Sequence, residues 1–357
     1  GISYSNIEGS IPASIGNLTA LTTLTLNRNN LSGTIPQEIW NLTNLTKINL
    51  IDNQLTGTLP NAIANASNFL EIDLQNNQLT GSMPAGFGQL VELNELNLRD
   101  NQLSGELPDG FCGIGSNNTF NGTVTQDYLL FYLGGNNFSG EVPSCICDMD
   151  YMYFFFISTN SASSMHFGDN NFCPPYPSCS AGYYATGGDN YSPVGDLSRL
   201  FSNDSGIQIN QDVTECPLDD CGVAGGTNDP DTGTCDCNAT PNGDADYDNC
   251  GVCREPGDSD YDSTCIEWDG RYFDKETTTS IYCNASNISD TEIPENIGEM
   301  VNLQTLACEN RDLTGSIPSS IGNLTQLTRL ELGYNDLTGS IPQQIGNLES
   351  LEILELH

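Results

Sequence analysis

Proline recurs at a constant spacing of 24 residues along two stretches of the chain, and this regularity restricts the fold more than any other feature. The spacing holds from Pro12 to Pro108 and again from Pro294 to Pro342. Around each proline lies the pattern of residues 21–42, LTTLTLNRNNLSGTIPQEIWNL. A period near 24 with L-x-x-L-x-L-x-x-N-x-L predicts a solenoid, in which each coil buries a narrow apolar stripe against its neighbours.

Each position of the repeat has a structural role. Leu21, Leu24 and Leu26 are expected to point into the coil, and the strand around them should pair in parallel with the next coil. In the following Leu-x-Gly-x-Ile-Pro segment, glycine permits the bend. Proline has no N–H to donate to a neighbouring strand, so it fits an extended segment that needs no hydrogen bond at that position. An asparagine in one register can bond to backbone groups as the chain turns, which predicts a ladder of such side chains. These residues are Asn29, Asn53, Asn77, Asn101, Asn136 and Asn335.

The repeat phase also identifies the side chains that should point outward from the concave sheet. They form a mostly polar, mildly acidic row with no aromatic ring other than that of His357, and its two arginines lie in different arrays. The positions are Thr23, Thr25, Asn27, Lys47, Asn49, Ile51, Glu71, Asp73, Gln75, Glu95, Asn97, Arg99, Thr305, Ala307, Glu309, Arg329, Glu331, Gly333, Ile353, Glu355 and His357.

The pattern L-x-G-x-I-P-x-x-I-G-N-L resembles the plant-type leucine-rich repeat of receptor-kinase ectodomains and polygalacturonase-inhibiting proteins. The resemblance covers roughly residues 1–179 and 265–357. It implies an α/β-type, mainly β solenoid: a leucine-rich-repeat superhelix with a parallel concave sheet, a second short sheet on the convex side, and a disulfide-rich irregular segment. It also implies that ligands bind on the concave strand face.

The resemblance extends to segments that would cover the open ends of the arrays. Residues 169–179, DNNFCPPYPSC, resemble the family's C-terminal cap, which implies a Cys173–Cys179 disulfide. Residues 265–283 resemble its N-terminal cap, in which Trp268 would cover the first coil and Cys265 would pair with Cys283.

Other disulfide pairings remain open at this stage. Cys283 has an alternative partner in Cys308, which occupies an interior leucine position one coil later. Cys112 and Cys147 occupy the same repeat position on either side of an insertion and are candidates for a disulfide. Cys145 is the competing partner.

These caps predict three segments in an unusual order. Residues 1–179 form an array that ends in a C-terminal cap, residues 180–264 an acidic linker module, and residues 265–357 a new N-terminal cap with a second array. The linker contains the related phrases GDADYDNC and GDSDYDSTC, which resemble Asp- and Gly-rich cysteine modules of extracellular proteins. Alternating carboxylates suit Ca²⁺, although a solvated, disulfide-tied linker explains them equally well. The candidate ligands are Asp244, Asp246, Asp248, Asp258, Asp260 and Asp262.

Charge and cysteine usage restrict the partners and the compartment. A formal charge of −38 excludes ordinary nucleic-acid binding, which needs a basic surface. Fourteen cysteines with only two histidines favour disulfides over zinc, and hence secretion. The longest strongly apolar run, residues 151–157, is too short to insert into a membrane.

Glycosylation sequons point to the same extracellular location, although G-N-L-T and N-N-L-S also arise from the repeat itself. We therefore predict N-glycans on part of this set. The sequons begin at Asn17, Asn30, Asn41, Asn44, Asn65, Asn117, Asn121, Asn137, Asn190, Asn203, Asn238, Asn284, Asn287 and Asn323.

The two ends of the sequence are complementary halves of one coil. The chain stops after the strand LEILELH and begins with the convex half GISYSNIEGSIP. These ends either are limits of a longer tandem protein or let copies of the chain stack head to tail into a filament.

No catalytic arrangement is visible in the sequence, because neither His166 nor His357 has a nucleophile or acid partner at a recognisable spacing. We expect no enzyme activity and no required cofactor. The favoured function is a secreted structural or adhesive scaffold that contacts copies of itself, extracellular proteins or glycans. The alternative is a ligand-recognition module, such as a receptor ectodomain or an inhibitor of wall-degrading enzymes.

Overall fold

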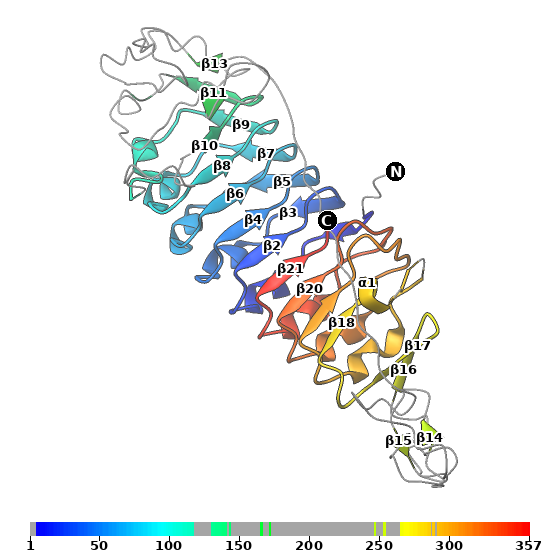
Figure 1. Cartoon of the computed structure of the whole chain (residues 1–357). Coiled ribbons are helices and arrows are strands. Elements are labelled where there is room, and N and C mark those ends of the chain that lie inside the picture. Colours follow the sequence, from blue (N-terminus) through cyan, green and yellow to red (C-terminus); the bar gives the residue numbers. More distant parts are fainter. Residues whose placement is uncertain are drawn as a thin grey trace, which may run out of the picture.

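The computed structural model describes residues 5–117, 130–140, 143, 165–166, 171–172, 246–247, 253–254, 265–286, 288–289 and 291–357. Within these residues the chain forms an elongated stack of coils, with two rows of strands running along the stack (Figure 1). This arrangement confirms the predicted mainly β solenoid. Among the described helices, none is long and apolar enough to cross a membrane.

The main sheet has ten parallel strands, one from each coil, in the order β12-β10-β8-β6-β4-β2-β21-β20-β19-β18. Its solvent-exposed side is called the strand face below. The strands are β2 (Thr23–Thr25), β4 (Lys47–Asn49), β6 (Glu71–Asp73), β8 (Glu95–Asn97), β10 (Leu130–Tyr132), β12 (Met165–His166), β18 (Ser280–Tyr282), β19 (Thr305–Ala307), β20 (Arg329–Glu331) and β21 (Ile353–Glu355).

The second sheet that the family resemblance implies is present. It has seven parallel strands in the order β1-β3-β5-β7-β9-β11-β13. Gly57 illustrates the backbone that this sheet requires, because its φ is +87° and an added Cβ would lie 2.8 Å from Thr34 Cγ2. The strands are β1 (Glu8–Ser10), β3 (Asn30–Thr34), β5 (Gln54–Thr58), β7 (Gln78–Gly81), β9 (Gln102–Gly105), β11 (Asn137–Gly140) and β13 (Asn171–Phe172).

Short 3-10 helices complete the coils, and the sequence analysis did not place them. The periodic proline lies directly before each helix except η5 (Phe111–Gly113), which Gly110 precedes; Pro12 has extended backbone with φ −70° and ψ 137°. The helix then turns the apolar side chain of Ile15 inward. The helices are η1 (Ala13–Asn17), η2 (Gln37–Asn41), η3 (Asn61–Asn65), η4 (Ala85–Gln89), η5 (Phe111–Gly113), η8 (Glu295–Glu299), η9 (Ser319–Asn323) and η10 (Gln343–Asn347).

The two arrays join into one solenoid, with the strand of the last coil pairing with that of the first. β21 pairs with β2 in the same register as every other neighbouring pair, with Leu354 opposite Leu24. Leu356 N–H donates to the Thr25 carbonyl at 2.8 Å. On the other side of this coil Glu8 N–H donates to the Gly339 carbonyl at 2.7 Å. The complementary halves at the two chain ends thus complete one coil within a single chain.

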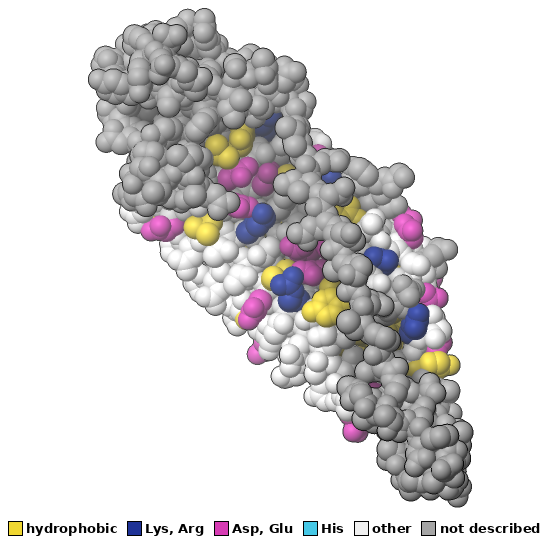
Figure 2. Space-filling view, viewed as in Figure 1, with side chains coloured by type: hydrophobic (Ala, Val, Ile, Leu, Met, Phe, Trp, Pro, Cys, Tyr) yellow, Lys and Arg dark blue, Asp and Glu magenta, His cyan; other side chains and the backbone are white. Residues whose placement is uncertain are grey.

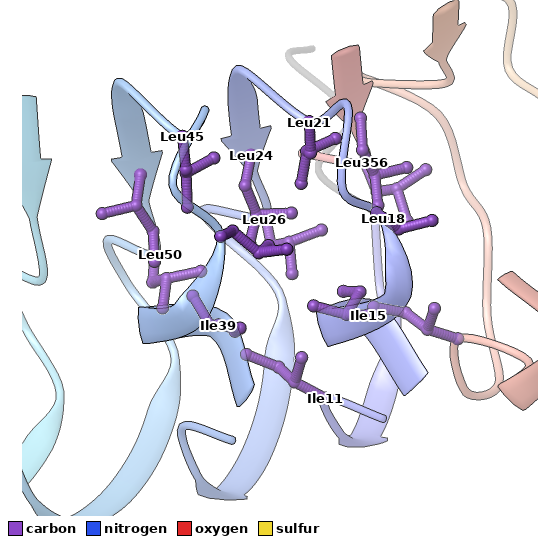
Figure 3. Packing of buried hydrophobic residues seen from close by; sticks show 14 of the residues in the cluster. Ile11, Ile15, Leu18, Leu21, Leu24, Leu26, Ile39, Leu45, Leu50 and Leu356 are labelled. Atoms are coloured by element: carbon purple, nitrogen blue, oxygen red, sulfur yellow. The ribbon is translucent and has the colours of Figure 1, made fainter. Parts of the chain in front are cut away.

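The apolar core runs through this junction without a break. Leu356 is fully buried among the side chains of the first coil, including Leu18 and Leu21 (Figure 3). Leu24, Ile48 and Leu96 are likewise 0% exposed and line the same interior. At the junction an added Cβ on Gly346 would lie 2.4 Å from the Ser14 carbonyl oxygen, so this glycine permits the close approach of the two coils.

The predicted asparagine ladder is present. Asn53 Nδ2 donates to the Leu26 carbonyl of the preceding coil at 3.0 Å and to the Leu50 carbonyl of its own coil at 3.2 Å. Its Oδ1 accepts a hydrogen bond from Leu31 N–H at 3.0 Å. The ladder also crosses the junction, because Asn29 Nδ2 donates to the Leu356 carbonyl at 2.7 Å.

The N-terminal cap lies at one end of the solenoid and consists of two short segments. The antiparallel hairpin β16 (Cys265–Trp268) and β17 (Arg271–Asp274) places Trp268 in the core cluster, where its side chain is 2% exposed. The helix α1 (Cys283–Ser286) follows strand β18. Trp268 therefore covers apolar side chains, as expected for a cap residue.

Outside the cap, a second antiparallel pair is formed by β14 (Asp246–Tyr247) and β15 (Cys253–Arg254).

The disulfide prediction at this cap is partly wrong. Cys283 is bonded to Cys308, with Cα atoms 4.8 Å apart, so the predicted Cys265–Cys283 bridge does not form. The Cys283–Cys308 pairing forms because Cys308 lies buried in the coil next to β18, whereas Cys265 begins the hairpin. Cys265 and Cys112 are each disulfide-bonded. The predicted partner Cys147, the Cys173–Cys179 pair and the segment boundaries at residues 179 and 264 lie outside the described residues and stay predictions.

Replacing a ladder asparagine is expected to destabilise the fold. The Asn53→Ala substitution removes the side-chain partner of Leu31 N–H and of the Leu26 carbonyl inside the core. Leaving these groups unpaired should lower the free energy of unfolding by about 2–4 kcal/mol, measured by chemical denaturation. The matched control is Gln78→Ala, an exposed strand residue, which should change it by less than about 0.5 kcal/mol. Equal effects would contradict the structural role of the ladder.

Candidate functional site

The strand face carries a group of polar side chains over β4, β6, β8 and β10, which we call the acidic patch. The face displays acidic and basic side chains side by side (Figure 2). Parallel pairing aligns equivalent positions on neighbouring strands, so these side chains lie in rows along the stack. The acidic patch comprises Lys47, Glu71, Asp73, Glu95, Asn97 and Tyr132.

One row of the acidic patch is formed by Lys47, Glu71 and Glu95, which are successive partners in the sheet. Lys47 Nζ lies 2.6 Å from Glu71 Oε2, and both side chains remain 42% exposed. Burial, followed by repulsion from the Glu71 carboxylate, raises the pKa of Glu95 above its ordinary value. The row therefore contains one carboxylate in an exposed ion pair and one that lacks a partner of opposite charge at ion-pair distance among the described residues.

The second row centres on Asp73, whose pKa is raised to about 7 mainly by burial. Its Oδ1 accepts a hydrogen bond from Gln75 N–H at 3.2 Å, and its Oδ2 accepts one from Asn97 Nδ2, also at 3.2 Å. Asn97 donates as well to Gln75 Oε1 at 2.9 Å. These bonds fix the orientation of the carboxylate, although they only partly offset the cost of burying its charge.

Tyr132 is an aromatic side chain on this face that the sequence analysis missed. It is the Cα partner of Asn97 in the sheet, and its side chain is half-buried. The pKa of its hydroxyl is raised, first by burial and then by the charge of Glu95. The insertion between Pro108 and Pro143 hid this coil, yet counting back from Asn136 places Phe131 at the Leu24 position and Tyr132 beside it.

Several predicted outward positions are less exposed than expected. Thr25, Asn27, Asn97 and Thr305 are each under 9% exposed. Asn97 is buried because Asp73 and Gln75 hold its amide between them.

Near the junction of the two arrays a hollow of about 370 Å³ adjoins Arg28. Its lining residues are Ser5, Asn6, Arg28, Asn29, Asn30 and Asp52.

The remaining site predictions have mixed outcomes. Of the six candidate Ca²⁺ ligands only Asp246 falls within the described residues, in β14, so Ca²⁺ binding stays a prediction. Among the described residues, one group can bring its ligand atoms together for a metal ion, and it consists of Glu309, Glu355 and His357. Nine sequon asparagines are exposed, which permits glycosylation without testing it: Asn17, Asn30, Asn41, Asn44, Asn65, Asn117, Asn137, Asn284 and Asn323.

The coils, ladder and two sheets define a protein built of leucine-rich repeats, and family comparison agrees. Models described as "Leucine-rich repeat region", "Leucine rich repeat" and "Leucine Rich Repeat" match residues 282–357, 43–103 and 20–42, respectively. These matches agree with the leucine-rich-repeat fold of the described coils. A comparison with curated proteins gave no match.

Solved structures similar to the chain include plant receptor ectodomains. The ectodomain of the Arabidopsis thaliana receptor kinase GASSHO1/SCHENGEN3 is 22% identical, with a TM-score of 0.40 over 98% of this chain and 28% of its own length. The plant peptide hormone receptor RGFR1 in complex with RGF2 is 22% identical, with a TM-score of 0.39 over 99% and 43%. A plant ice-binding protein is 19% identical, with a TM-score of 0.38 over 94% and 74%. The chain thus spans less than half the length of either ectodomain.

The titration of Asp73 predicts a pH dependence of stability. Its folded pKa lies above the ordinary value of 3.8, so its contribution to stability is full below about pH 4 and is lost as the pH rises through 7. The Asp73→Asn substitution should therefore stabilise the protein at pH 8 relative to the wild type and have little effect at pH 4. Chemical denaturation of both proteins across this range measures the difference, and a difference that does not change with pH would contradict the burial of this carboxylate.

Proposed function

We propose that this protein is an extracellular recognition module that binds a cationic ligand, such as a Lys- or Arg-rich segment of another protein, on the acidic patch. The observation that carries the proposal is the row of Glu71 and Glu95 beside Tyr132 on one face of a rigid sheet. Two carboxylates attract a cation, and an aromatic ring gives it an apolar or cation–π contact. Their positions are fixed by strand pairing, so little ordering would be needed on binding.

Electrostatics support a cationic ligand over an anionic one. Lys47 neutralises Glu71 only in part, because both groups remain exposed to water at 42%. The raised pKa of Glu95 results from burial and from its like-charged neighbour Glu71, so an approaching positive charge would relieve this repulsion. The whole chain carries a formal charge of −38, which would also attract basic partners over a distance.

The junction of the two arrays favours recognition over the self-contacting structural scaffold that the sequence analysis favoured. The apolar ends that would drive head-to-tail stacking pack against each other within one chain, at Leu356 and the first coil. The ten-stranded face is also longer than either array alone, which gives a ligand more surface. Secretion, N-glycans and the lack of enzyme activity belong to this proposal, whereas assembly between copies stays an untested prediction outside it.

The proposal is tested with a Lys/Arg-rich peptide and an acidic peptide of equal length, both fluorescently labelled, by anisotropy at low and high salt. The basic peptide should bind and the acidic one should not. The double substitution Glu71→Gln with Glu95→Gln should weaken binding about tenfold, the sum of two partly exposed ion pairs near 0.7 kcal/mol each. Tyr132→Ala should weaken it further.

The matched control removes the same charge elsewhere. Glu38 and Glu349 are exposed and lie outside the strand face, in η2 and in the turn after η10. Glu38→Gln with Glu349→Gln should change the affinity less than about twofold. If both double variants weaken binding equally, the peptide responds only to net charge, and the acidic patch is not the binding site.

A further inference from the structure

Two carboxylates and an imidazole converge at the other end of the strand face. Glu355 lies in β21, Glu309 follows β19, and His357 follows β21. One ligand atom from each of these three side chains lies within 4.8 Å of the other two. We call this group the histidine cluster. It shares no residue with the acidic patch.

The residue between Glu309 and His357 along the stack explains why these side chains meet. The coil of β20 lies between the coils of β19 and β21, and its equivalent position is Gly333. An added Cβ on Gly333 would lie 2.8 Å from His357 Cε1 and 2.9 Å from His357 Nδ1. The missing side chain therefore leaves the space that the imidazole occupies, two coils from Glu309. The ring of Tyr334 packs edge-on against the imidazole, with centroids 4.5 Å apart.

His357 is held in place without a hydrogen bond to Nδ1. The residue is 9% exposed, and Nδ1 is shielded from water with no hydrogen-bond partner among the described residues. Leaving a buried polar atom unpaired costs free energy, and an ion that completes the site removes this cost. Burial, reinforced by the nearby Arg28 guanidinium, lowers the pKa of His357. An imidazole nitrogen without a hydrogen-bond partner is available to ligate a metal ion.

The carboxylates of the cluster lack a sufficient counter-charge. Neither Glu309 nor Glu355 forms an ion pair with a basic side chain among the described residues. Arg329 forms its ion pair with Glu331, the acid that lies between them along the stack. Arg28 lies close enough to repel a cation, but its own charge is shared with Asp52, whose Oδ2 is 3.7 Å from Arg28 Nε. A divalent cation would relieve the remaining repulsion between carboxylates.

We propose that Glu309, Glu355 and His357 bind a divalent transition-metal ion of the Zn²⁺, Co²⁺ or Ni²⁺ class. One imidazole nitrogen with two carboxylates suits these ions, whereas Ca²⁺ and Mg²⁺ prefer oxygen ligands alone. Ligand atoms around tetrahedral zinc lie about 3.3 Å apart, so the three side chains need to close by about 1.5 Å through rotamer changes. A tetrahedral ion bound by three side chains would have a fourth position for water or for a group of a bound molecule.

The test is titration of the full chain with Zn²⁺ or Co²⁺ at pH 7.5, followed by calorimetry and by NMR of the imidazoles. The chain has only two histidines, so the ring signals of His357 are assigned by comparison with His357→Ala. One equivalent of Zn²⁺ should shift the His357 signals, and Co²⁺ should broaden them. His357→Ala should lower the affinity at this site at least thirtyfold, and Glu309→Gln or Glu355→Gln about tenfold.

The control separates metal ligation from general acidity. Glu331→Gln removes a neighbouring charge that is engaged by Arg329, and it should weaken Zn²⁺ binding less than about threefold. Ca²⁺ should leave the His357 signals unchanged. The proposal is overturned if Zn²⁺ binds without moving these signals, or if His357→Ala and wild type bind it equally. Either result would place the ion elsewhere on this acidic chain, and neither bears on peptide binding at the acidic patch.

Discussion

The asparagine ladder, with the leucine spine behind it, is the interaction on which the rest of the structure depends. A coil of 24 residues is too small to bury an apolar core alone, so its stability comes from the coils on either side. Each ladder asparagine joins backbone groups of two coils; Asn53, for example, donates to three carbonyls and accepts from one N–H. Because Asn29 makes the same bonds to Leu356, the first and last coils behave as sequence neighbours despite their separation in the chain.

The order of segments in space therefore differs from their order in sequence. The N-terminal cap and the second array come first along the stack, and the first array follows. Contacts such as Leu356 with the first coil close a very long loop, which costs conformational entropy that the buried spine must offset. One consequence is functional. A face of ten strands holds the acidic patch and the histidine cluster on one rigid surface, so the two proposed sites keep a fixed spacing.

Much of this fold could be predicted from the sequence, because each position of a strict repeat occupies the same place in every coil. The phase of Leu24 and Asn29 placed the strand, the ladder and most outward side chains correctly. The 3-10 helices were missed because their inward apolar residues recur once per repeat. An extended segment at the same place in the coil would show the same recurrence. Closure of the two arrays within one chain was also missed, because complementary ends do not reveal whether they join in one molecule or between two.

The candidate sites were harder to predict, and the reasons are physical. Tyr132 lies in a coil whose proline phase is broken by an insertion, so the repeat gave no direct alignment. The histidine cluster depends on the absence of a side chain at Gly333, an effect that appears only when three coils are stacked. The Cys283–Cys308 bridge likewise depends on which of two candidate cysteines faces the neighbouring coil. Local sequence resemblance favoured Cys265, and packing favoured Cys308.

The central claim is that the first and last coils pair within one molecule, and a designed cross-link tests it most directly. Thr23 and Ile353 are Cα partners on neighbouring parallel strands, a spacing of about 5 Å that suits a disulfide. Thr23→Cys with Ile353→Cys, oxidised in a mixture of unlabelled and ¹⁵N-labelled protein, should give a monomer whose cross-linked peptides are wholly light or wholly heavy. Cross-linked peptides with one light and one heavy half, from covalent oligomers, would show that the coils pair between molecules and would contradict the account.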